Sequence, residues 1–224
     1  MSTAFFPTSS PLQIRRLSIL MLLAALFAAP GTGVLAQDVP EVVQDVLDRA
    51  QRQQENGRLD EALESFLEAR ELGPQVVEVH VGLGAVYVGL GRNEEALDAF
   101  VQGLESDADN RDLLFNAAVI ALRLERYGEA LRFVERALSG HARDVQLRLV
   151  HAAVLDRLDR GEDALRALEA ADDLAPRTPQ ILFRLGNQLH QLGRGEEAVG
   201  AYRRALDEDR SMLRAQMIFV QRIL

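Results

Sequence analysis

One short pattern recurs along the chain at a fixed interval of 34 residues. The segment Gly-Arg-Leu-Asp-Glu-Ala-Leu begins at Gly57, and related segments begin at Gly91, Glu125, Asp159 and Gly193, with no insertion or deletion between them. A fixed period of this length is the signature of stacked repeats, in which each unit buries its apolar face only against its neighbours. The chain is therefore expected to form a linear stack of five similar units.

The residue types within each repeat indicate two helices joined by a turn. Gly57, Gly91 and Gly193 stand where a helix is expected to end, because glycine adopts the left-handed conformation of a C-terminal cap at little cost. Acidic residues follow, and they stabilise the positive N-terminal end of the next helix. On this second helix every repeat then has a small residue, a large one and another small one. The first small residues are Ala62, Ala96, Ala130, Ala164 and Ala198, and the large ones are Phe66, Phe100, Val134, Leu168 and Tyr202. The second small residues are Ala69, Gly103, Ala137, Ala171 and Ala205. Their spacings of four and three place them on one face, which predicts close helix packing.

This pattern resembles the tetratricopeptide repeat family. The residues that carry the resemblance are Leu83-Gly84, Tyr87, Ala96 and Phe100 in one repeat, and Leu185-Gly186, Ala198, Tyr202 and Ala205 in another. The resemblance implies an all-α fold, a right-handed superhelical solenoid of stacked antiparallel helix pairs. No repeat has the family's Trp, and the fourth carries Arg148 and His151 where apolar residues are expected. Its first helix is expected either to pack more loosely or to pair these groups with neighbours.

The repeat register divides the chain into four parts. Residues 1–36 are set apart as a signal peptide, 37–42 form a short lead-in, 43–212 hold the five repeats, and 213–224 form a C-terminal helix that Ser211 can cap. The repeats are 43–76, 77–110, 111–144, 145–178 and 179–212.

The first 36 residues have the layout of a secretory signal peptide. Arg15 and Arg16 precede an apolar run over residues 17–29, and Val34-Leu35-Ala36 forms a small-residue cleavage site. The run is shorter than the ~20 apolar residues of a spanning helix; an uncleaved anchor is the alternative. Cleavage would remove two arginines and no acid, changing the net charge from −9 to −11, and would leave no integral membrane segment. The protein is then exported, to the periplasm if the source is a two-membrane bacterium.

Composition argues against catalysis, metal binding and nucleic-acid binding. Cysteine is absent, and the four histidines His80, His141, His151 and His190 form no ligand pair one helical turn apart. His80 and His151 are expected to be interior histidines with their hydrogen bonds satisfied. A net charge of −9 disfavours nucleic acid, whose backbone attracts basic surfaces. We therefore expect a non-catalytic protein without a cofactor or metal, whose partner is a protein or a peptide.

The resemblance also implies where a partner binds. In this family the first helices line a concave groove, which here places ten residues in the groove: Val81, Ala85, Val88, Phe115, Asn116, Val119, Leu122, Leu149, Phe183 and Asn187. The family's clamp for carboxylates needs several basic residues, but the corresponding positions hold Leu47, Gln146 and Val150. An apolar peptide or amphipathic helix is thus the expected ligand. The alternative for individual residues, Leu47 and Leu149 especially, is that they complete the packing between first helices.

Two functions are compatible with these features. The first is an exported scaffold that binds partner segments in its groove during assembly of cell-envelope complexes. The second is a structural subunit of a larger envelope complex, held by its C-terminal helix or convex face. In that helix Val220 and Ile223 are expected to pack on the fifth repeat, whereas Met217, Ile218 and Leu224 are left over. These three form a candidate patch for homo-oligomerisation or partner binding, with a frayed tail as the alternative.

Overall fold

The computed structural model describes residues 40–209, all of which belong to the repeat stack or its immediate edges. Ten helices and no strand lie within these residues. In chain order the helices are α2 (Glu41–Glu55), α3 (Leu59–Leu72), α4 (Val77–Gly89), α5 (Asn93–Ser106), α6 (Arg111–Arg123), α7 (Tyr127–Gly140), α8 (Val145–Arg157), α9 (Gly161–Leu174), α10 (Pro179–Gln191) and α11 (Gly195–Glu208). The all-α prediction is confirmed.

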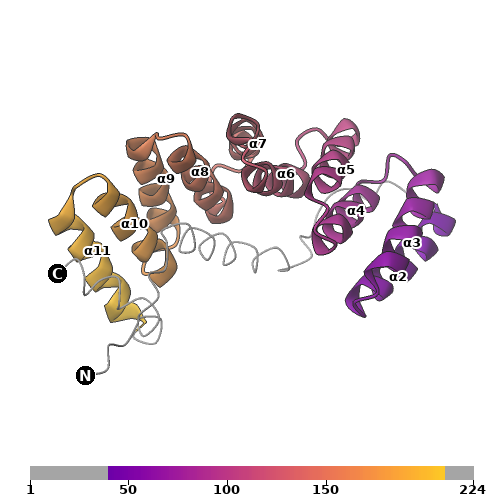
Figure 1. Ribbon diagram of the computed structural model, residues 1–224, viewed down its shortest axis with the longest axis horizontal. Helices are drawn as coiled ribbons and strands as arrows, with labels where there is room; N and C mark the ends of the chain where they lie inside the picture. The colour runs from indigo at the N-terminus through magenta and orange to yellow at the C-terminus, as the bar shows by residue number, and fades with distance from the viewer. Residues whose placement is uncertain (1–39, 210–224) are drawn as a thin grey trace, which may run out of the picture. The chain divides into compact units, whose positions relative to one another are not determined.

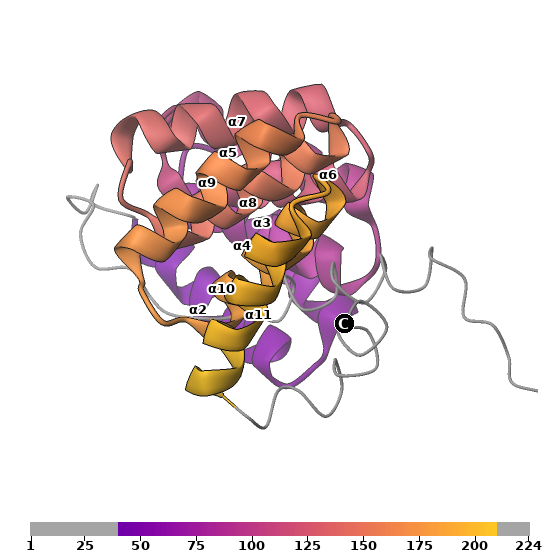
Figure 2. The ribbon, with the colours of Figure 1, turned by 90° about the vertical axis from the view of Figure 1, so that its left-hand side faces the viewer.

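Each helix packs against the next one along the chain, and the pairs repeat regularly. The helices α2 and α3, α4 and α5, α6 and α7, α8 and α9, and α10 and α11 form five hairpins. The second helix of each hairpin also contacts the first helix of the following one (Figure 1). Seen from the side, the second helices α5, α7 and α9 lie together along one edge, with the first helices α4, α6 and α8 below them (Figure 2). The described residues therefore form a helical solenoid.

The turn inside each hairpin has a left-handed residue at one fixed position. The φ angles there are 73° at Gly57, 74° at Gly91 and 75° at Gly193, as the sequence predicts. The third and fourth hairpins have Glu125 and Asp159 at this position, with φ angles of 61° and 57°. Because a β-carbon is strained in this region, the turn geometry is imposed by the stack even where glycine is missing.

The small residues of the second helices form the centre of every hairpin. Ala62, Ala96, Ala130, Ala164 and Ala198 are all completely buried. Such full burial of a methyl group leaves no room for a larger side chain, so this row fixes the distance between the two helices of each hairpin.

Three large aromatic residues on second helices are each matched by a glycine on a facing helix. A β-carbon at Gly84 would overlap the Phe100 ring, and one at Gly186 would overlap the Tyr202 ring. The ring of Phe66 instead lies over Gly82 of the next hairpin. Protein interiors are close-packed, so each ring needs this missing side chain to fit. The first two rings thus fill their own hairpin, whereas Phe66 joins two successive hairpins.

The N-terminal end of the stack is polar. In the second hairpin Val79, Leu83 and Val86 are fully buried. The same repeat positions in α2 hold Asp45, Arg49 and Arg52, all three exposed. Solvated outer faces of this kind are what terminal units of repeat proteins need.

Candidate functional site

The ten residues predicted to line the groove lie on four first helices, and we call them the first-helix face. Val81, Ala85 and Val88 belong to α4; Phe115, Asn116, Val119 and Leu122 to α6; Leu149 to α8; and Phe183 and Asn187 to α10. Direct contacts join α2 to α4 and α6 to α8, so in these two pairs the neighbouring first helices touch each other as well as their hairpin partners. Their use in binding stays a prediction.

Burial separates the first-helix face into two groups. Phe115, Val119 and Leu149 are buried, with exposed fractions of 6%, 6% and 9%. The other seven residues are half-buried. Leu47, for which packing was the alternative role, is only 2% exposed. The buried members therefore contribute mainly to packing between helices, and the half-buried ones offer the accessible apolar surface.

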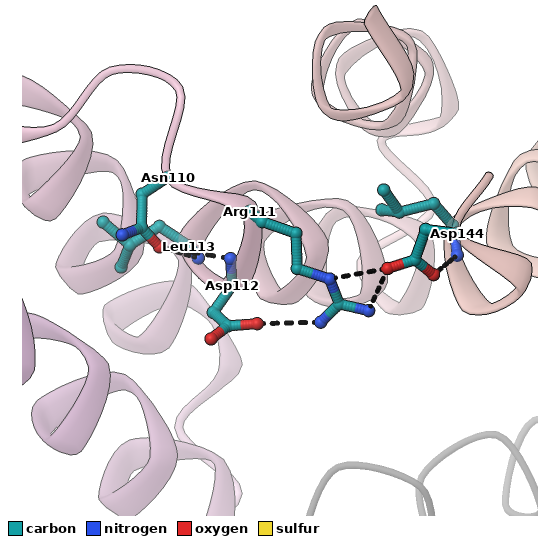
Figure 3. Close-up of polar contacts among 6 residues, drawn as sticks. Asn110, Arg111, Asp112, Leu113 and Asp144 are labelled. Carbon is teal, nitrogen blue, oxygen red and sulfur yellow. Dashed lines mark hydrogen bonds and ion pairs between the residues drawn. The ribbon is translucent and has the colours of Figure 1, made fainter. Parts of the chain in front are cut away.

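Phe115 is covered by an arginine that joins two repeats. The guanidinium carbon of Arg111 lies 4.9 Å from the centre of the Phe115 ring. Its Nε donates to Oδ2 of Asp144 at 2.9 Å, and its Nη2 forms an ion pair with the same oxygen at 2.8 Å. Its Nη1 donates to Oδ1 of Asp112 at 2.8 Å (Figure 3). The other carboxylate oxygen of Asp144 accepts a hydrogen bond from the backbone of Leu147 at 3.0 Å, which caps α8. The Arg111 guanidinium thus contributes to the burial of the Phe115 ring.

The environment of Arg111 keeps its charge in place. Burial works against the charged form, but hydrogen bonds and ion pairs with Asp112 and Asp144 outweigh it and raise the pKa of Arg111 above its ordinary value. The first turn of α6 is fixed separately, because the Asn110 side chain accepts from the backbone of Asp112 and Leu113, each at 3.1 Å (Figure 3). Side-chain contacts therefore tie the start of α6 both to its own backbone and to the start of α8.

The two asparagines of the face differ in their hydrogen bonding. The Tyr202 hydroxyl donates to Oδ1 of Asn187 at 2.8 Å, and its ring lies 5.4 Å from that of Phe183. Burial raises the pKa of Tyr202 to about 12, so the hydroxyl remains a donor. Asn116 has no side-chain hydrogen bond to any residue that the structure describes. The amide nitrogen of Asn187 and the whole amide of Asn116 are therefore open to a partner backbone.

One residue that the sequence reasoning omitted belongs beside this face. Arg184 on α10 occupies the same repeat position as Asn116 on α6, two repeats later. It is half-buried and makes no ion pair with any described residue. The repeat register alone could have identified this position.

The interior histidines are satisfied only in part. His80 is 3% exposed, and its Nε2 lies 2.7 Å from the carbonyl oxygen of Pro74, but its Nδ1 is buried without a partner. His151 has a buried Nε2 without a hydrogen bond, 4.0 Å from a carboxylate oxygen of Glu135. The expectation of full satisfaction is wrong, because one buried ring nitrogen of each histidine has no hydrogen-bond partner among residues 40–209.

The unusual fourth repeat is regular despite its two polar residues. Arg148 donates through Nε and Nη2 to the carbonyl oxygen of Ala142, at 3.0 and 2.6 Å. Its helix α8 has the same length as α4, α6 and α10. Of the two outcomes expected for this repeat, pairing with a neighbouring group is confirmed for Arg148.

Several sequence predictions lie outside the described residues. They concern the signal peptide, the C-terminal helix and its patch of Met217, Ile218 and Leu224. In residues 40–209 no helix is long and apolar enough to cross a membrane, and no group of three or more His, Cys, Asp or Glu side chains could hold a metal ion.

Sequence comparison decides the family. A tetratricopeptide repeat model matches residues 46–175, more than half of the chain, and a second one matches residues 149–212. The chain belongs to the tetratricopeptide repeat family. This membership supports protein–protein interaction as its class of function. No curated protein sequence matches the chain.

Solved tetratricopeptide repeat structures share this fold at low sequence identity. One is MamA residues 41-end from Desulfovibrio magneticus RS-1, with a TM-score of 0.73, 18% identity, and coverage of 77% of this chain and 98% of that one. Another is YrrB, described as a TPR protein with an unusual peptide-binding site, with a TM-score of 0.65, 21% identity, and coverage of 77% and 93%. At these identities the likeness establishes the tetratricopeptide fold alone.

Proposed function

We propose that this protein is a non-catalytic scaffold that binds an apolar peptide or amphipathic helix on its first-helix face. The observation that carries the proposal is the set of half-buried apolar side chains on three of the first helices, with Val81, Ala85 and Val88 on α4, Leu122 on α6 and Phe183 on α10. Each offers partly accessible apolar surface, and binding would remove that surface from water. The free amide of Asn116 would pair with a partner backbone.

Binding is tested with a peptide selected from a library of random twelve-residue sequences displayed on phage, using residues 37–224 as bait. The affinity of this peptide is then measured by calorimetry for the wild type and two variants. Ala85→Arg places a long charged side chain on α4 and should weaken binding at least tenfold, about 1.4 kcal/mol. Val101→Arg makes a similar change on the second helix α5, where Val101 is 39% exposed, and should change the affinity less than twofold.

The proposal includes export through the N-terminal 36 residues. It is supported by the Arg pair, the apolar run over residues 17–29 and the cleavage signal ending at Ala36. Expression of the full chain in a two-membrane bacterium, followed by fractionation and N-terminal sequencing, should give a periplasmic protein that begins at Gln37. A membrane-bound protein that retains residues 1–36 would show that the segment is an anchor.

The second candidate, a structural subunit held by other surfaces, rests on the apolar residues exposed on second helices. Leu72 on α3 and Val101 on α5 are 47% and 39% exposed. If Val101→Arg abolishes partner capture while Ala85→Arg leaves it intact, this candidate replaces the first. Deletion of residues 213–224 tests the C-terminal helix, since an unchanged mass in solution removes self-association through it.

A further inference from the structure

The first hairpin has an outer face that no other repeat precedes. In the second hairpin the equivalent side of the first helix packs into the same core as α2 and α3, through Val79 and Leu83. Because a repeat buries its apolar face only against a neighbour, the end of a stack is the place where a further element can be added. We call this surface the N-terminal end face, and it consists of Val42, Asp45, Arg49, Arg52 and Gln53 on α2 and Ser65, Glu68 and Leu72 on α3.

The middle of the N-terminal end face is a polar network. Arg49 forms an ion pair with Glu68, and its Nε donates to the Ser65 hydroxyl at 3.2 Å. That hydroxyl in turn donates to Oε1 of Gln53 at 2.7 Å. These side chains therefore use their hydrogen-bonding groups on one another, and they show which sides of α2 and α3 form the face.

Two apolar residues extend the face beyond this network. Val42 lies seven residues before Arg49 on α2, and Leu72 lies four residues after Glu68 on α3. Spacings of four and seven residues keep side chains on one side of a helix. Val42 and Leu72 therefore belong to the same face as the network.

Val42 and Leu72 also lie at the same end of the first hairpin. A β-carbon on Gly73, the residue after Leu72, would lie 3.2 Å from the side chain of Val43, the residue after Val42. Val42 is 56% exposed and Leu72 is 47% exposed, and in residues 40–209 only one other large apolar side chain is exposed. Accessible apolar side chains that gather on one face indicate a contact surface.

The charges beside this apolar pair are acidic. Glu41 precedes Val42, Asp45 follows it by one turn, and Glu71 precedes Leu72. All three acids are exposed, and none forms an ion pair with a residue of the described range. The surface therefore suits a partner segment that is both apolar and basic.

Residues 210–224 of the chain itself have this chemistry. They contain Arg210, Arg214 and Arg222 and no acidic residue, although the whole chain has a net charge of −9. The same segment holds the three apolar residues that are not expected to pack on the fifth repeat, Met217, Ile218 and Leu224. The two surfaces are complementary in charge as well as in apolar character.

We propose that residues 210–224 of one copy bind the N-terminal end face of a second copy. Apolar side chains of the segment pack on Val42 and Leu72, and its arginines lie beside the acids there. Three hairpins separate the first hairpin from the fifth, so the contact joins two copies rather than the two ends of one. Such a contact is head-to-tail, because it uses different surfaces on the two copies, and it can add further copies in a row. It does not depend on binding at the first-helix face.

The test follows the mass of residues 37–224 in solution by sedimentation over a range of protein concentrations. Leu72→Arg alters the N-terminal end face, and Ile218→Glu alters the C-terminal segment. Val101→Arg is the matched control, since Val101 is an apolar residue of a second helix with 39% exposure but lies on α5, away from the end face. Circular dichroism and thermal unfolding confirm that each variant is folded.

The wild type and Val101→Arg should associate with constants within about twofold of each other, and Leu72→Arg and Ile218→Glu should each associate at least about tenfold more weakly. An equimolar mixture of Leu72→Arg and Ile218→Glu should form a heterodimer and no larger species. The reason is that Leu72→Arg retains an intact C-terminal segment and Ile218→Glu retains an intact end face.

Three results would overturn the proposal. The first is a wild type that stays monomeric at every concentration, which is also the result expected if the segment binds within its own chain. The second is association of Leu72→Arg or Ile218→Glu at the strength of the wild type. The third is a mixture of these two variants without a heterodimer, which would indicate a symmetric contact between C-terminal segments.

Discussion

Arg111 and Asp144 join the third repeat to the fourth through a hydrogen bond from Nε at 2.9 Å and an ion-pair contact of Nη2 at 2.8 Å, both to one carboxylate oxygen. Asp144 also caps the first helix of the fourth repeat through its other oxygen. The Asp144 side chain thus stabilises both the N-terminal end of α8 and the contact between two repeats. Because stacked repeats derive stability from contacts between neighbours, this pair lies at a place where its loss should be measurable.

Substitutions at Asp144 should separate its two roles. Asp144→Asn retains a capping side chain but removes the charge that binds Arg111, so it should lower the free energy of unfolding by about 0.5–1 kcal/mol. Asp144→Ala removes both and should cost about 1 kcal/mol more. Urea unfolding monitored by circular dichroism measures both values. Arg111→Gln in the Asp144→Asn background should add little, and a fully additive loss would show that the pair is not coupled.

The match between aromatic rings and glycines predicts an asymmetric response to alanine. Gly84→Ala should lower the free energy of unfolding by about 1–3 kcal/mol, because the new methyl group overlaps the Phe100 ring. Gly128→Ala adds the same group to α7, where nothing lies within 4 Å, and should leave stability unchanged or raise it by up to about 1 kcal/mol. Equal effects in thermal unfolding would contradict the packing described for Phe100.

Two opposite substitutions at the left-handed turn position should change stability in opposite directions. Glu125→Gly should stabilise the protein by about 0.5–1 kcal/mol, because glycine relieves the strain at a φ of 61°. Gly91→Glu at the same position of another repeat should destabilise it by about 1 kcal/mol. Chemical denaturation of both variants tests the claim, which fails if the two changes have the same sign.

His151 should make the stack sensitive to acid. Burial lowers the pKa of His151 below its ordinary value of 6.5, and nearby Arg160 and Arg148 act in the same direction, against Glu135 and Asp163. The unfolded chain therefore binds a proton more readily than the folded one, and stability falls as the pH drops below about 6.5 towards the folded pKa. His151→Leu should remove this part of the pH dependence, whereas His141→Gln, at an exposed position, should keep it. Parallel stability curves for wild type and His151→Leu between pH 7 and 5 would refute this account.

Much of the fold follows from sequence periodicity. The 34-residue register, the caps at Gly57 and Gly91 and the row of small residues around Ala96 are local features, and the structure confirms them. The same register would also have predicted the left-handed conformation of Glu125, although this residue is not a glycine.

The candidate site was less predictable, because it depends on contacts between repeats. The position of the Arg111 guanidinium over the Phe115 ring could not be predicted from the repeat positions of these two residues. Arg111 is also bound by Asp144, which lies in another repeat, in the turn before α8. Phe115, at 6% exposure, is therefore a poor site for a disruptive substitution, and Ala85 is a better one.

The central claim is that partners bind the first helices, and hydrogen–deuterium exchange of the protein with its selected peptide tests it most directly. Binding should slow amide exchange in α4, α6 and α10, which carry the half-buried apolar residues, and leave α5, α7 and α9 unchanged, after correction for any uniform stabilisation of the stack. Protection confined to the second helices, with α4, α6 and α10 exchanging as in the free protein, would contradict the account.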